Sequence, residues 1–284
     1  MLAAGFTFAS CALFGNRPDR DEHGYYHLLL NNLAEVCDVP LVVATNEPAA
    51  FHPRIETVRV EDLHEWSSRI WDPLDQDEVV IRLLQWHRKN RKLAQFAEPH
   101  LIGVYLAKMA LLFDIASRHG DVVWIDAGLV FSAVYHHSVP GDWRGYDRHV
   151  IETRLMPRIA EQRATNKPMV TTFRRRRKLF HTHKPHFQGM SYDGMESLAR
   201  RIGAVPDDDY TAAAMLYLPG DLASQTQSQF KDVWAEMVRM GRMGTEETVL
   251  TELRWKNGWD SLSHVEWLDL VREAPNTETP VEGH

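Results

Sequence analysis

The stretch GDVVWIDAGLVF, residues 120–131, sets one carboxylate directly after four apolar residues and directly before an Ala-Gly pair. The run VVWI at 122–125 is typical of a strand that is buried on both faces at the centre of a parallel sheet. Asp126 would then follow the carboxyl end of that strand, where ligands of open α/β sheets bind. The small residues after it, including Gly128, would let a ligand approach the backbone closely. We therefore interpret Asp126 as a ligand-binding carboxylate; the alternative is an Asp that only begins a turn.

Strand-like and helix-like segments alternate through the first half of the chain. Strand-like segments at 6–14, 40–46 and 55–60 are joined by a helix-like segment at 22–37, and an apolar helix over 100–118 leads into the strand at 121–126. This order is the signature of parallel βα units. Farther on we expect a helix near 149–165, a strand near 168–173 and a last strand at 211–219, followed by helices. The sequence thus predicts an α/β fold, with a mostly parallel sheet flanked by helices.

The length and composition of the chain limit the number of domains and the kinds of partner that we expect. A chain of 284 residues is long enough for one large domain, to which we assign 1–270, and residues 271–284 have the composition of a flexible tail. The net charge of −7 argues against a general polyanion binder, so we expect no nucleic-acid partner. No apolar run reaches the ~18 residues of a membrane span. Two cysteines without metal-ligand spacing favour a reducing compartment, and we expect a cytoplasmic protein.

Lys108 and Arg17 are candidate anion contacts. Lys108 sits in an apolar helix in which Asp114 and Arg118 can pair at i, i+4, but it has no such partner of its own. An unpaired buried ammonium is costly, which favours a diphosphate partner; the alternative is a side chain that extends to the surface along its own stem. Arg17 follows the first strand and suits bidentate phosphate contacts, and the alternative is a solvated turn.

Two acids begin a late helix. Thr245 is a good N-cap residue, and Glu246 and Glu247 in the first turn would be stabilised by the helix dipole without any function. Alternatively, one of them reaches an acceptor hydroxyl as a general base or an anchor. His264 could contact a metal ion or a phosphate, although a lone histidine is more often structural.

Four segments resemble bacterial glycosyltransferases of the GT-A fold, in particular the WlaTC/HtrL (YibB-like) group. They are ASCALFGNRPD (9–19), YLAKMALLFDIA (105–116), VVWIDAGL (122–129), and TAAAMLYLP (211–219) followed by GRMGTEETVLTEL (241–253). Their order along the chain is that of the family. The resemblance implies a GT-A-like, Rossmann-like fold with a nucleotide-sugar donor bound by the half 1–131 and a carbohydrate or small-molecule acceptor bound by the half 132–270.

The resemblance also implies roles for individual residues. Catalysis would involve Asp126, Glu247 and Glu246; the donor would be contacted by Arg17, Lys108, Asp126 and Gly128; and Mn²⁺ or Mg²⁺ would be held by Asp126 and His264. Many GT-A enzymes carry Asp-x-Asp where this chain has Asp-Ala-Gly, so a second carboxylate is absent. Binding of Mg²⁺ or Mn²⁺ through one acid, water and phosphate oxygens is physically reasonable, and the missing second acid leaves open whether a metal is required.

Two other functions remain open at this level. A protein that binds nucleotides without transferring sugar would keep the same donor features. A metal-dependent hydrolase could use His181 and His183 in the basic segment RRRRKLFHTHKPHF, although these histidines lack a matching carboxylate motif. Sugar-dependent turnover separates the first from a glycosyltransferase, and loss of activity on removal of both histidines would identify the second.

Overall fold

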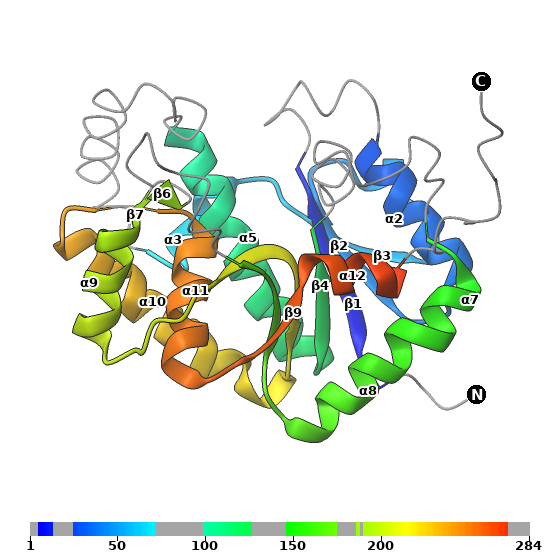
Figure 1. Cartoon of the computed structure of the whole chain (residues 1–284). Coiled ribbons are helices and arrows are strands. Elements are labelled where there is room, and N and C mark those ends of the chain that lie inside the picture. The colour runs from blue at the N-terminus through cyan, green and yellow to red at the C-terminus, as the bar shows by residue number, and fades with distance from the viewer. Residues whose placement is uncertain are drawn as a thin grey trace, which may run out of the picture.

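A seven-stranded mixed sheet forms the centre of the fold (Figure 1). The computed structural model describes residues 5–13, 25–71, 99–126, 146–174, 186–187, 190–242 and 244–271. The order of the strands across the sheet is β3-β2-β1-β4-β8-β5-β9, and β8 runs antiparallel to both of its neighbours while the other pairs are parallel. Their bounds are β1 Thr7–Ala12, β2 Leu41–Thr45, β3 Ile55–Arg59, β4 Val122–Ile125, β5 Met169–Arg174, β8 Asp209–Leu218 and β9 Asp260–Ser263. The prediction of an α/β fold with a mostly parallel sheet is confirmed.

Helices cover both faces of the sheet, so the fold has three layers (Figure 1). One face packs against α3 Leu63–Ser68, α5 Pro99–His119, α9 Tyr192–Ile202, α10 Ala223–Arg239 and α11 Glu246–Asn257. The other packs against α2 Tyr25–Val36, α8 Met156–Thr165, the π-helical turn η3 Ile151–Leu155 that precedes it, and α12 His264–Val271. The shorter elements are η1 Pro48–Ala50, α7 Arg148–Val150, η4 Gly220–Leu222 and a small hairpin of β6 His186–Phe187 and β7 Met190–Ser191.

The alternation of side chains along β4 explains why this strand is apolar throughout. Val122 and Trp124 pack into the core on one face, and Val123 and Ile125 pack into the core on the other. Successive side chains of a strand point to opposite faces, so a strand with helices on both sides needs apolar residues at every position. The apolar run of the sequence therefore predicted a central strand correctly.

One feature of the fold differs from the prediction. The segment 211–219 was expected to be the last strand, but β9 follows it and forms the edge of the sheet beside β5. Its sequence DSLS has a single buried apolar residue, Leu262, and gives almost no strand signal. The predicted tail lies largely outside the described residues.

Candidate functional site

The chain reverses its direction across the sheet between β1 and β4. It passes from β1 to β2 and β3 on one side and then returns to place β4 on the other side of β1. Ligands of open α/β sheets bind at the carboxyl ends of the strands at such a reversal. The hydroxyl of Ser10 in β1 donates a buried hydrogen bond of 2.6 Å to the carbonyl oxygen of Ile125, which joins the two strands at this edge. Asp126, the next residue, therefore stands at the point where the topology predicts a ligand.

Lys108 lies at the centre of a buried charge cluster at this edge. Its Nζ is 2.9 Å from Asp126 Oδ2 and 3.3 Å from Glu246 Oε1. The side chains of Lys108 and Glu246 are 11% and 5% exposed, whereas that of Asp126 is 36% exposed and so offers the cluster to solvent. Three elements meet here: α5 carries the ammonium, the end of β4 one carboxylate, and the first turn of α11 the other.

This geometry bears on both interpretations of Lys108, because the ammonium is buried but not unpaired. The side chain does not extend to the surface, because the residue is only 8% exposed. Its partners come from other parts of the chain, which a helical spacing rule cannot reveal. The prediction that Asp114 and Arg118 pair at i, i+4 is confirmed, since their side chains are 2.5 Å apart on this helix.

The electrostatics of the cluster keep Lys108 charged. Burial by itself lowers the pKa of Lys108, but the carboxylates of Asp126 and Glu246 raise it by more, and the net shift is upward. Glu247 lies close enough for its charge to raise the pKa of Lys108 further. Burial raises the pKa of Glu246, against the opposing effect of Lys108. The cluster thus combines a permanent cation with a carboxyl group whose proton affinity is increased.

Two residues that the sequence analysis missed border the cluster. Burial raises the pKa of the Cys11 thiol to about 12, so at neutral pH this group is a neutral thiol beside Lys108 and Asp126. Burial and then the charge of Asp126 raise the pKa of Tyr146, which places its phenol near that carboxylate. No spacing rule connects either residue to Asp126, so only the fold shows their position.

The start of α11 sets the position of Glu246. Thr245 occupies the N-cap position as predicted, but its side chain makes no capping hydrogen bond, and the Thr248 amide donates instead to the Thr245 carbonyl at 3.1 Å. A Cβ atom added to Gly244 would lie 2.0 Å from the hydroxyl oxygen of Thr248, so only glycine fits there. Both predicted acids are in the first turn: Glu246 is buried, and Glu247 is partly exposed.

Several predicted site residues are not brought together with this cluster. Arg17, Gly128, His181 and His183 lie outside the described residues. His264 begins α12 directly after β9, and β9 is separated from β4 by β8 and β5. Three strand spacings amount to about 14 Å, so His264 and Asp126 belong to different regions of the same edge.

The residues of the cluster offer few ligands for a divalent metal. Within the described ranges there is no group of three or more His, Cys, Asp or Glu side chains arranged to hold a metal ion. Asp126 Oδ2 and Glu246 Oε1, which would be the natural oxygen ligands, both contact the ammonium of Lys108. The described donor set therefore does not fit Mn²⁺ or Mg²⁺.

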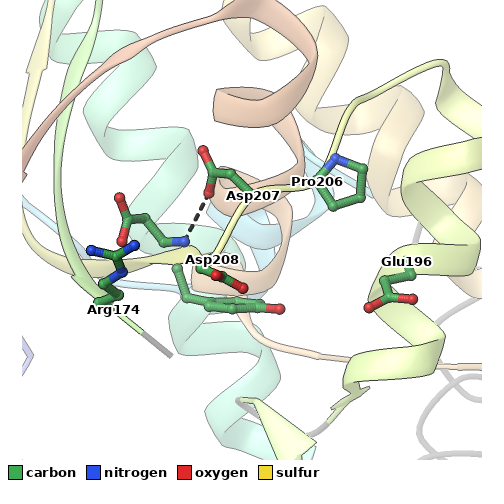
Figure 2. Close-up of a pocket in the computed structure, with 7 residues that line it drawn as sticks. Arg174, Glu196, Pro206, Asp207 and Asp208 are labelled. Atoms are coloured by element: carbon green, nitrogen blue, oxygen red, sulfur yellow. Dashed lines mark hydrogen bonds between the residues drawn. The ribbon is translucent and has the colours of Figure 1, made fainter. Parts of the chain in front are cut away.

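A separate pocket of about 490 Å³ lies farther out along β8 (Figure 2). It is lined by Arg174, Glu196, Pro206, Asp207, Asp208, Asp209 and Tyr210. Asp207 accepts hydrogen bonds from the Asp209 amide at 2.8 Å and from Trp255 Nε1 at 2.9 Å, and it also pairs with Arg254. Burial alone would raise the pKa of Asp207, but these partners lower it overall. The pocket is acidic, and none of its lining residues belongs to the Lys108 cluster.

Comparison with known proteins adds no family. The sequence matches no protein-family model, and no curated protein is significantly similar to it. Of the helices in the described part of the chain, none combines the length and apolar character needed to cross a bilayer.

Proposed function

We propose that the protein is a glycosyltransferase with a GT-A-like fold, which transfers a sugar from a nucleotide-sugar donor to an acceptor hydroxyl. The observation that carries this proposal is the link from Asp126 through Lys108 to Glu246. Through Lys108 it links a carboxylate at the reversal of the sheet to the first turn of a late helix. A donor site in the first half of the chain and an acceptor site in the second half would then share one cluster.

The charge of the cluster favours sugar over free phosphate. Among the described residues around Lys108, the carboxyl groups of Asp126, Glu246 and Glu247 outnumber the single ammonium. Ionised carboxylates accept strong hydrogen bonds, and sugar hydroxyls can donate them. We therefore assign the sugar ring and the reacting acceptor hydroxyl to this cluster, and we assign the diphosphate to the adjoining part of the carboxyl edge.

The proposed reaction needs three events at the anomeric carbon. The acceptor oxygen forms a bond to it, the bond to the nucleoside diphosphate breaks, and a base takes the proton from the acceptor hydroxyl. Glu247 is the assigned base, because it stands in the same helical turn as Glu246 and is partly exposed. Lys108 holds Asp126 and Glu246 in place, and such fixed polar groups stabilise developing charge without rearranging.

A binding screen tests the proposal directly. Nucleotide sugars of different base and sugar are added to the protein and its melting temperature is measured, because a ligand that binds the native state raises stability. The best donor is then incubated with acceptors, and release of nucleoside diphosphate is compared with and without acceptor. We expect stabilisation by one donor class and acceptor-dependent release.

The role of Asp126 is tested with a matched pair of variants. Asp126→Asn should fold normally and weaken donor binding by about tenfold or more, which is the value of a lost hydrogen bond to a charged group. Asp114→Asn removes a carboxylate of the same type from the outer end of α5 and should leave donor binding unchanged. Equal donor affinity in Asp126→Asn and the wild type would show that Asp126 does not contribute to the donor site. If donors raise the melting temperature but no sugar is released, the protein binds nucleotides without transferring sugar.

A further inference from the structure

The cluster presents two carboxylates, from different elements, to one positive charge. Asp126 Oδ2 and Glu246 Oε1 face the same ammonium at 2.9 and 3.3 Å. Two convergent carboxylates of this kind are a common way to hold a divalent cation beside a phosphate. In this protein Lys108 Nζ already occupies the position on which the two carboxylates converge.

We propose that Lys108 is the resident cation of this site, and that its ammonium takes the place between Asp126 and Glu246 that a divalent metal would otherwise occupy. A metal ion bound to Asp126 Oδ2 would lie within a few ångströms of Nζ, and two positive charges at that separation repel each other strongly in a partly buried site. The described residues also supply no third ligand that would offset this repulsion. The protein therefore binds no divalent metal through Asp126.

The described surroundings of Lys108 oppose any movement of its ammonium away from the carboxylates. It projects from the part of α5 that carries Leu106, Ala107 and Met109, all of which are almost completely buried in the core. Withdrawal of the ammonium from its partners would leave it in apolar surroundings without compensation, which is costly.

The inference has two parts, of which only one rests on the proposed function. If the protein transfers sugar, a fixed single charge replaces the divalent ion, and turnover should survive removal of metals. Independently of any reaction, the wild-type protein should not bind Mn²⁺ at this cluster. A charge that belongs to the chain needs no metal supply and cannot be removed by a chelator.

The decisive measurement is Mn²⁺ binding, followed by electron paramagnetic resonance, to the full chain without donor or acceptor. The variants are Asp126→Asn, Lys108→Met, Lys108→Arg and, as a matched control, Lys167→Met, which removes an exposed lysine. We expect wild type and Asp126→Asn to behave identically. Lys108→Met should gain Mn²⁺ affinity by about tenfold or more, because it removes a nearby positive charge and frees two carboxylates. Lys108→Arg and Lys167→Met should show no gain.

The outcomes separate clearly. Mn²⁺ bound by the wild type and lost in Asp126→Asn would overturn the proposal, as would a folded Lys108→Met protein that gains no affinity. If the wild type and Asp126→Asn bind Mn²⁺ with equal affinity, the ion is bound at another site, and the proposal is supported. If Lys108→Met does not fold, the wild type and Asp126→Asn decide the question by themselves. If no donor is found, the proposed function is rejected, but the Mn²⁺ results can still be interpreted. If a chelator abolishes donor turnover and Mn²⁺ restores it, the resident-cation inference alone is overturned.

Discussion

Lys108 and Glu246 lie 138 positions apart in the chain, and their side chains meet at 3.3 Å between Nζ and Oε1. The two residues belong to α5 and α11, helices on the same face of the sheet, and both are nearly excluded from solvent. The contact therefore joins the first half of the fold to the second at the candidate site. Loss of the Lys108 charge would leave Glu246 buried without its counterpart, whereas loss of the Glu246 charge would leave Lys108 paired with Asp126 alone.

The first prediction concerns the stability of this pair. Lys108→Met should lower the free energy of unfolding by about 3–5 kcal/mol at neutral pH, because it leaves Glu246 as an uncompensated buried acid. Glu246→Gln introduced into the same background should recover part of that loss. Urea denaturation of the wild type, both single variants and the double variant measures the coupling. If the two single effects simply add, the pair is not energetically coupled and the prediction is wrong.

The second prediction separates the two acids of α11. Glu247→Gln should leave donor affinity intact and lower the transfer rate by about 10²–10⁴, the usual contribution of a general base. Glu246→Gln should alter both quantities, because Glu246 contacts Lys108 and through it Asp126. Donor affinity from calorimetry and the rate at saturating donor provide the two readouts. Collapse of donor binding in Glu247→Gln, with persistent turnover of bound donor, would refute this assignment.

The sequence predicted the central part of the fold because burial on both faces leaves a direct signal. The apolar run ending at Ile125 identified β4 and with it the position of Asp126. Gly120 follows the last residue of α5 and adopts a φ of +83°, which glycine allows. The orientation of β8 carried no such signal, because parallel and antiparallel strands share the same pattern of burial when both faces are covered.

The site was only partly predictable, since its assembly depends on contacts between distant segments. Asp126, Lys108 and Glu246 were each selected individually, but no spacing rule connects α5 to α11. The sequence could not separate Glu246 from Glu247, whereas the structure places Glu246 in contact with Lys108.

The third prediction concerns Asp121, which organises the amino-terminal edge of β4, opposite the site. Its carboxylate accepts hydrogen bonds from Arg163 Nε at 2.8 Å, from the Tyr217 hydroxyl at 3.1 Å and from the Gly220 amide at 3.0 Å. Asp121→Ala should lower the free energy of unfolding by about 2–3 kcal/mol, because three donors lose one charged acceptor.

The matched control for Asp121 is Asp114→Ala, which removes a carboxylate whose ion pairs with Arg118 and Arg69 lie near the surface. Exposed pairs contribute about 0–1 kcal/mol, so this variant should remain close to the wild type. Chemical denaturation of both variants gives the comparison. Equal losses in Asp121→Ala and Asp114→Ala would show that Asp121 has no special structural role.

The fourth prediction concerns the acid Glu252 in the middle of α11. The residue is completely buried, and neither of its carboxylate oxygens has a hydrogen-bond partner within the described part of the chain. Burial raises the pKa of Glu252 from 4.5 to about 9, so the folded protein holds a proton there at neutral pH. The unfolded chain, in which the glutamate is solvated, releases that proton above pH 4.5.

The sign of the pH dependence follows from this difference in bound protons. The stabilising contribution of the bound proton is complete below pH 4.5 and is lost as the pH rises to about 9. Across that range the free energy of unfolding should fall by up to about 1.4 kcal/mol for each pH unit. Glu252→Gln carries a neutral group of the same shape and should remove this contribution.

The measurement compares unfolding of wild type and Glu252→Gln at a series of pH values between 5 and 9, which lie inside the range set by the shifted pKa. Other buried acids such as Glu246 titrate equally in both proteins, so the difference between the two curves isolates Glu252. Glu65→Gln on α3 removes an exposed carboxylate and serves as the control. We expect Glu252→Gln to gain stability over the wild type steadily as the pH rises, while Glu65→Gln stays parallel to it. A constant difference between Glu252→Gln and wild type at all pH values would mean that Glu252 is ionised in the folded protein, and that a charge partner for it exists beyond the contacts described.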